Sequence, residues 1–322
     1  MDGAPPLMNL QTTTSRSRLP RFRRVPEPPR MVMTERDKRI LHAVHEYRML
    51  TREQIERLLF APEFGQDHFT KTSKVRHRLK VLYQNKYLER VPLPVGNATW
   101  AWQPVYRLAR SGAELVASDL GVNSKDLIYW GKGDDKDRRA THATPLFLNH
   151  TLCINDVRIA FQLAAQHYGY RVETWLDDVH LKSQERKDHV AVRDEEGNKM
   201  VAVIPDSYFV LNLGNRRAPF FLEVDRATMS NSRWGTRIHA YLAYVRSGKY
   251  TERYQMRALR ILTVTTTEQR LMNLKETTRK AGGGDLFWFT TMEQMSAGSV
   301  FFDPIWRLAN DEPERARKSL LG

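Results

Sequence analysis

Three acidic side chains in the second half of the chain have the types and spacing of a metal-binding site. Asp206 lies in an apolar run that predicts a strand over 200–211, and Glu223 and Asp225 lie in a second predicted strand over 219–225. Side chains alternate along a strand, so Glu223 and Asp225 are expected on one face, and Asp206 on the adjacent antiparallel strand can converge with them. Carboxylate oxygens are the ligands that Mg²⁺ prefers, and such a metal can activate water for attack on phosphate. One interpretation is therefore a catalytic Mg²⁺ site.

The same carboxylates have a second interpretation as ion-paired structural groups. Arg226, Arg233 and Arg237 follow them closely in the sequence and could supply the cations. Three acids on facing apolar strands are costly without either a metal or cations. The sequence leaves both interpretations open.

A further candidate metal ligand, Asp156, lies on a long apolar helix predicted over 146–167. Asn149 precedes it by one heptad and shares its face better than His150 does. Polar residues on a buried helix, such as Asn149 and Asp156, also commonly form hydrogen bonds within a protein core. Asp156 is therefore either a ligand or a structural residue.

A helix with a strongly basic surface is predicted over 70–85. Val75, Leu79 and Leu82 recur at the spacing of a buried helical stripe. No acidic residue occurs between Phe69 and Tyr87, so the remaining surface of this helix carries positive charge.

The elements around the basic helix have the order of a winged helix-turn-helix. Two helices precede it, over 34–48 and 51–60, and two strands follow it, over 87–93 and 102–108. In that fold the third helix lies in the major groove and the hairpin reaches the flanking backbone. The alternative is a module of the same fold that binds protein, with its basic face merely solvated. The candidate DNA-binding side chains are Lys71, Lys74, Arg76, His77, Arg78 and Lys80 of the helix and Arg90 of the first strand.

The charge balance favours a polyanionic partner. The net charge is +14, and residues 1–110 carry 21 basic and 10 acidic side chains. Such an uneven distribution is typical of a protein that binds nucleic acid, and we expect double-stranded DNA.

The composition excludes two other classes of protein. No apolar stretch reaches the ~18 residues that a membrane-spanning helix needs. The single cysteine, Cys153, excludes an intrachain disulfide and a cysteine zinc site. A cytoplasmic location is expected because the cytosol is reducing.

The second half of the chain predicts the order αβββαβ, with a further helix and strand. This is the order of a restriction-endonuclease-like core, so the fold class expected is a two-domain α+β and α/β protein with an N-terminal winged helix-turn-helix. Periodicity and composition predict these segments: a basic flexible arm over 1–33, the winged helix over 34–121, a polar linker over 122–144, the nuclease-like domain over 145–310 and a tail over 311–322.

The sequence resembles two nested families. Pro205-Asp206 and Glu223-Val224-Asp225 resemble the PD and (D/E)XK elements of the PD-(D/E)XK nucleases. About 270 residues, from Thr34 onward, resemble the bacterial replication-relaxation family of plasmids and other mobile elements. The segments that carry this resemblance are Thr34–Asp37, Leu50–Ile55, Val105–Leu108, His150 with Asn155–Arg158, Glu223–Arg226 and Pro304–Trp306.

The resemblance implies a DNA-binding protein of a mobile element, with plasmid replication or relaxation proteins as possible partners. A Mg²⁺-dependent endonuclease or nickase is the alternative, with Asp206 and Glu223 as ligands. The position of the nuclease motif's lysine is Asp225 here, so the sequence departs from the catalytic pattern, although Arg237 on the next helix could return a cation to the site. A third alternative is a non-catalytic protein-interaction module.

Overall fold

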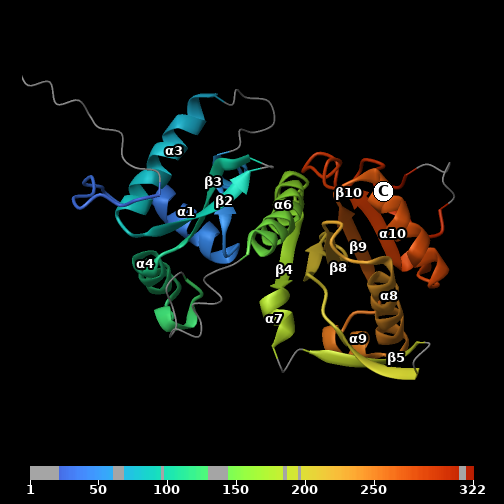
Figure 1. Cartoon of the computed structure of the whole chain (residues 1–322). Helices are drawn as coiled ribbons and strands as arrows, with labels where there is room; N and C mark the ends of the chain where they lie inside the picture. The colour runs from blue at the N-terminus through green and yellow to red at the C-terminus, as the bar shows by residue number, and fades with distance from the viewer. Residues whose placement is uncertain are drawn as a thin grey trace, which may run out of the picture.

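A three-stranded and a six-stranded sheet, each packed against helices through hydrophobic residues, organise the described part of the chain, and a two-stranded sheet adds to the second of them (Figure 1). The computed structural model describes residues 22–60, 69–95, 98–129, 144–183, 187–194, 197–311 and 317–322. We refer to 22–129 as the N-terminal unit and to 144–322 as the C-terminal unit. Together they form a mixed α/β protein, and no helix among the described residues is long and apolar enough to cross a membrane.

The N-terminal unit packs its helices against a three-stranded sheet with the strand order β1-β3-β2. Thr34 caps the first helix, and a reciprocal bond from its backbone N–H to Asp37 completes a capping box. Ile40, Leu41 and Val44 are fully buried at helical spacing. The elements are α1 (Glu35–Glu46), β1 (Leu50–Thr51), α2 (Arg52–Phe60), α3 (Phe69–Gln84), β2 (Leu88–Val95), β3 (Ala98–Leu108), α4 (Arg110–Leu120) and the 3-10 helix η1 (Ser124–Asp126).

The C-terminal unit has three layers around a six-stranded sheet with the order β11-β10-β9-β8-β7-β4. Strands β4, β7 and β8 are antiparallel, and β8, β9 and β10 are parallel because helices cross between them. Helix α6 covers one face, and α8 and α10 cover the other. The elements are α6 (Pro145–His167), β4 (Arg171–Asp177), α7 (Asp178–Lys182), β5 (Asp188–Asp194), β6 (Gly197–Val203), β7 (Ser207–Asn212), β8 (Arg217–Asp225), α8 (Asn231–Arg246), α9 (Lys249–Tyr254), β9 (Arg260–Thr265), α10 (Glu268–Lys280), the 3-10 helix η2 (Gly284–Leu286), β10 (Phe287–Thr291) and β11 (Arg307–Leu308).

The strand expected over 200–211 is in fact two strands. Gly197–Val203 pairs with β5 in a separate two-stranded sheet, and β7 of the main sheet begins at Ser207. Pro205 lies at the break, where its missing N–H and fixed φ interrupt a ladder. Hydrophobic alternation alone cannot show that a strand changes sheets.

The predicted arm, linker and tail are partly built into the fold. In the predicted arm, Arg24 donates to the Tyr83 carbonyl at 2.9 Å and to Glu89 at 2.7 Å, while residues 1–21 lie outside the described residues. In the predicted linker, Leu127 is buried in the N-terminal core, while 130–143 lie outside. In the predicted tail, Leu320 is 1% exposed in the core between α6 and the sheet, while 312–316 lie outside.

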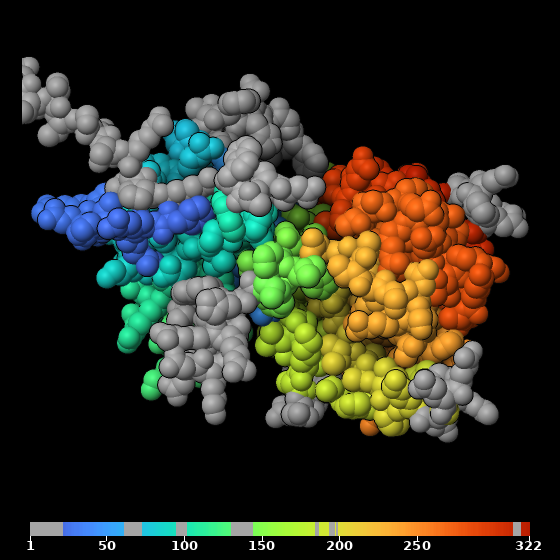
Figure 2. Space-filling model, viewed as in Figure 1, coloured from blue at the N-terminus to red at the C-terminus, as the bar shows by residue number. Residues whose placement is uncertain are grey.

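Helix α6 joins the two units, and in the space-filling view its green surface separates the blue and the orange halves (Figure 2). The Asn155 amide donates to the carbonyls of Tyr47 at 3.2 Å and Met49 at 2.7 Å, at the turn after α1. Arg158 lies over the Tyr47 ring at 4.2 Å. The Gln54 amide donates to the Leu152 carbonyl at 2.9 Å. Polar side chains of each unit thus satisfy backbone groups of the other.

Candidate nucleic-acid interface and buried carboxylates

Helix α3 buries one stripe and leaves its cations on the surface. Val75, Leu79 and Leu82 are at most 1% exposed in the N-terminal core. Arg76 lies 100° around the helix from Val75, so its side chain is directed away from that core and is exposed. Lys80 lies one turn further along the same side.

A groove of about 440 Å³ lies between α3, the start of α2 and the β2–β3 hairpin. Two rings hold Arg90 in it, because the guanidinium lies 4.6 Å from the centre of Tyr83 and 5.4 Å from that of Tyr106. Arg52 is paired with Glu53 at 2.6 Å. The groove residues are Arg52, Glu53, Arg76, Lys80, Arg90, Gln103, Pro104 and Tyr106.

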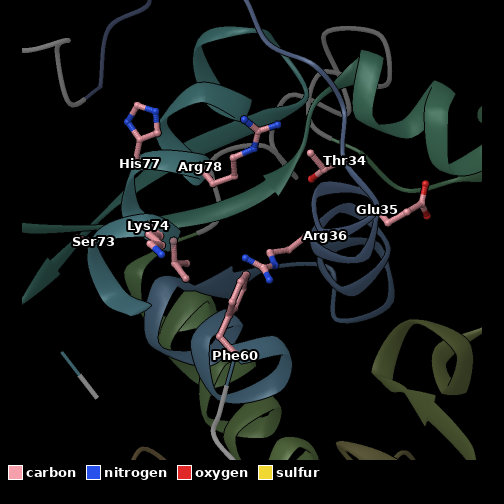
Figure 3. A pocket seen from close by; sticks show the side chains of 9 residues that line it. Thr34, Glu35, Arg36, Phe60, Ser73, Lys74, His77 and Arg78 are labelled. Carbon is pink, nitrogen blue, oxygen red and sulfur yellow. The ribbon is translucent and has the colours of Figure 1, made fainter. Parts of the chain in front are cut away.

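A second pocket, of about 800 Å³, lies on the other flank of α3 (Figure 3). Lys74 and His77 of α3 line it together with Arg36 of α1. The Arg36 guanidinium lies 5.4 Å from the centre of the Phe60 ring. The predicted DNA-binding residues are therefore divided between two surfaces. Lys71 lies on α3, but its side chain is outside what the structure describes.

Arg78 has a structural role that the sequence did not indicate. Its Nε donates to Asp37 at 2.6 Å, and a second bond joins the same two side chains. Asp37 is 0% exposed. Burial by itself would raise the pKa of Asp37, but hydrogen bonds from Arg78 and Thr34 bring it below its usual value. Arg78 is thus committed to a buried ion pair between α3 and α1.

The predicted carboxylates lie in one region of the sheet, and Glu223 is the most deeply buried of them, at 2% exposed. Arg237 of α8 donates to its Oε2 at 2.7 Å, and the Tyr241 hydroxyl donates to Oε1. Burial raises the pKa of Glu223 to about 8, although the charge of Arg237 acts in the opposite direction. The predicted pairing of Glu223 with Arg237 is present in the structure.

Asp206 and Asp225 have their own partners. Val224 N–H donates to Asp206 Oδ2 at 2.8 Å, and His150 Nε2 lies 3.2 Å from Oδ1. Burial acts to raise the pKa of Asp206, but the His150 contact brings it below its usual value. Arg270 of α10 donates to both oxygens of Asp225, at 2.7 and 3.1 Å.

The donor set of these three acids does not fit Mg²⁺. Each of their six oxygens already accepts from, or lies against, a protein donor. Among the described residues, no three His, Cys, Asp or Glu side chains gather to hold a metal ion. A metal here would have to displace Arg237 and Arg270 from the carboxylates.

Asp156 contacts the N-terminal unit. Gln54 donates to its Oδ1 at 3.0 Å, and Arg57 forms an ion pair with it. The structure therefore assigns it to the surface between the two units, in agreement with a structural role and not with ligation beside Asp206. Arg270 was not among the predicted partners, since it lies 45 positions from Asp225 and no local pattern marks it.

The fold and the site define a mixed α/β protein. It has a basic groove on the N-terminal unit and ion-paired carboxylates in the C-terminal unit. The sequence profile described as replication-relaxation matches residues 41–259, about two thirds of the chain, so the protein belongs to the replication-relaxation family. No match to a curated protein was found.

Two solved structures of one enzyme resemble the chain weakly. The structure of restriction endonuclease FokI is 12% identical with a TM-score of 0.29, covering 80% of this chain and 41% of that one. The structure of FokI bound to DNA is 10% identical with a TM-score of 0.27, covering 80% of this chain and 43% of that one. The chain thus spans less than half the length of these relatives.

Proposed function

We propose that this protein binds duplex DNA for a mobile genetic element through a winged-helix N-terminal unit. Three helices followed by a hairpin, with a short strand between the first two helices, support that fold. The family supports a role in plasmid replication or relaxation in the cytoplasm, alongside proteins of the same process.

The basic groove between α3 and the hairpin is the main support for duplex binding. Arg76 and Lys80 lie on the outward side of α3, and Arg90 lies across the groove on β2. A helix in the major groove brings such cations to phosphates on either side, and the hairpin reaches the adjacent backbone. The acid of the groove, Glu53, is already paired with Arg52.

The C-terminal unit supports a nuclease-like fold through its order of elements. A helix, an antiparallel three-stranded meander, a crossover helix and a parallel strand follow one another in the predicted αβββαβ order, with the β5–β6 hairpin as an insertion. We infer that this unit is a nuclease-like scaffold whose carboxylates stabilise the sheet through arginines.

A gel-shift titration with a labelled 20-base-pair duplex tests the binding proposal. The Arg76→Glu/Lys80→Glu variant is expected to lose about tenfold or more in affinity, because two phosphate contacts become repulsions. Arg110→Glu is the matched control, since Arg110 is exposed on α4 of the same unit and pairs with Glu114. Equal affinity of all three proteins would overturn the proposal, and binding without salt dependence would favour a protein-interaction module.

A Mg²⁺-dependent endonuclease is the second candidate, favoured by the buried Glu223 and Asp225 in one region of the sheet with the half-buried Asp206, and by the raised pKa of Glu223. It requires Arg237 to leave Glu223. Nicking of a supercoiled plasmid with Mg²⁺, absent with EDTA and lost in Asp206→Ala and Glu223→Ala, would establish it. DNA binding without nicking, both with Mg²⁺ and with EDTA, would support the interpretation of this unit as a non-catalytic scaffold.

A further inference from the structure

A row of arginines lies at the end of the C-terminal sheet away from the carboxylates. Asp225 lies at the last position of β8, whereas Arg217 lies at the first. Asn212 on β7 pairs with Arg217 on one side and with Arg171, the first residue of β4, on the other. Arg216 precedes β8, and Arg260 begins β9. The arginines of β4, β8 and β9 thus lie toward the same end of the sheet, with β7 between β4 and β8.

Two arginines of this row have no acidic partner among the described residues. Arg171 and Arg216 are exposed, and neither forms an ion pair with another described residue. Burial and the charge of Arg216 lower the pKa of Arg260. Arg217 is paired with Glu173 at 2.9 Å. The edge therefore carries excess positive charge.

Partly exposed aromatic rings adjoin the same edge. Tyr168 and Phe302 are 38% and 40% exposed, and their ring centres lie 4.7 Å apart. Tyr170, directly before Arg171, stacks on Tyr168 at 6.4 Å. Phe301 supports them from below and is 0% exposed. The segment that carries Phe302 lies beside the end of α6 from which β4 begins (Figure 1).

The chain terminus connects the rings to the arginines. Leu321 N–H donates to the Phe301 carbonyl at 3.0 Å, and Arg260 donates to the neighbouring Leu320 carbonyl at 2.6 Å. We call these rings and cations the aromatic-arginine edge: Tyr168, Tyr170, Phe302, Arg171, Arg216 and Arg260.

We propose that the aromatic-arginine edge binds single-stranded DNA. Rings that are open on the surface stack on bases whose faces are exposed, and in a duplex neighbouring base pairs cover those faces. Arginines beside the rings neutralise the phosphates of the same strand. A duplex on the N-terminal groove and a single strand on this edge would occupy separate surfaces of one molecule, as DNA that is partly melted would require.

Fluorescence anisotropy with a labelled twelve-nucleotide oligo(dT) tests this site. All measurements use the Arg76→Glu/Lys80→Glu background, so that the N-terminal groove does not contribute. The Tyr168→Ala/Phe302→Ala variant is expected to weaken binding about tenfold or more, since each lost base stack costs roughly a factor of ten. Arg171→Glu/Arg216→Glu is expected to weaken it as much and to flatten its salt dependence.

Two controls separate binding from folding. Tyr168→Phe keeps the ring and is expected to bind like the background protein. Trp102→Ala removes a ring of equal exposure, 38%, from the β2–β3 hairpin and is expected to have no effect on oligo(dT). A thermal unfolding profile checks that each variant is folded.

The outcomes also distinguish this inference from the proposed function. Unchanged oligo(dT) affinity in both edge variants would overturn the inference, as would equal competition by a twelve-base-pair duplex. Loss in the arginine variant with no loss in the ring variant would show backbone attraction without stacking, and would also overturn it. If the natural protein binds oligo(dT) at the edge but no duplex, the proposed function fails and the inference stands.

Discussion

Removal of Arg78 separates a residue needed for the fold from residues proposed to bind DNA. Asp37 is fully buried, so Arg78→Met leaves a carboxylate away from water with hydrogen bonds from Thr34 alone. Breaking a buried pair by removing one partner costs about 3–5 kcal/mol. The Arg78 side chain is 26% exposed, and water reduces that cost, so we expect a loss of about 2–3 kcal/mol in the free energy of unfolding.

Urea unfolding of the full chain measures this loss, and hydrogen exchange of α1 and α3 amides assigns it to the N-terminal unit. Arg76→Met is the matched control on the same helix, and it is expected to change stability by less than about 0.5 kcal/mol. In a double-mutant cycle, Asp37→Asn is expected to rescue Arg78→Met, because the buried charge is then gone. Additive effects in the cycle, or equal losses for Arg76→Met and Arg78→Met, would refute the reasoning.

The pH dependence gives a second check on the same pair. The folded pKa of Asp37 lies below its ordinary value, so its stabilisation is present above about pH 4 and is lost as the pH falls through the folded pKa. In Arg78→Met, burial raises the pKa of Asp37 without an arginine to oppose it. As the pH falls, the Asp37 carboxylate takes up a proton, and the free-energy cost of burying its charge disappears. The stability difference between the two proteins is therefore expected to be largest at pH 7 and to shrink below pH 4.

Three further predictions concern the C-terminal unit. Asn155→Leu removes two hydrogen bonds to the turn after α1 and is expected to cost about 2 kcal/mol in urea unfolding, whereas Asn149→Leu on the same helix should cost far less. The raised pKa of Glu223, about 8, means that folding binds a proton between pH 5 and 8, so stability should fall with rising pH there, and Glu223→Gln should remove that slope. The same dependence of stability on pH in the natural protein and in Glu223→Gln would contradict this prediction. Duplex binding should be unchanged by EDTA, because the carboxylates are occupied by protein donors, and a loss of affinity with EDTA would reopen the metal site.

Much of the fold follows from local patterns. The capping signal at Thr34, the buried stripe of α3 and the alternation of β8 are properties of neighbouring residues. Such patterns predict the helices, the hairpin and the order of elements along the second half of the chain. The break between β6 and β7 could not be predicted, because strand exchange between sheets depends on tertiary pairing. The short helices α7 and α9 were missed because their few residues carry no clear periodicity.

The residue types of the site could be predicted, and so could the pairing of Glu223 with Arg237, but the partners of the other acids could not. Glu223 and Asp225 lie on one face of β8, yet the cation of Asp225 comes from α10, at a distance that no motif spans. The pairing of Arg78 with Asp37 likewise joins two helices 41 positions apart. A count of charges treats all cations of α3 alike. Only the structure shows that Arg78 is already paired with the buried Asp37.

Salt-titrated anisotropy on a 20-base-pair duplex tests the central claim most directly. The slope of log affinity against log salt concentration counts the phosphates that the protein neutralises, at about 0.9 per contact. We predict that Arg76→Glu/Lys80→Glu lowers the magnitude of this slope by about 1.8, while Arg110→Glu leaves it unchanged. An unchanged slope in the double variant, or an equal change in the control, would contradict the assignment of duplex binding to the groove between α3 and the hairpin.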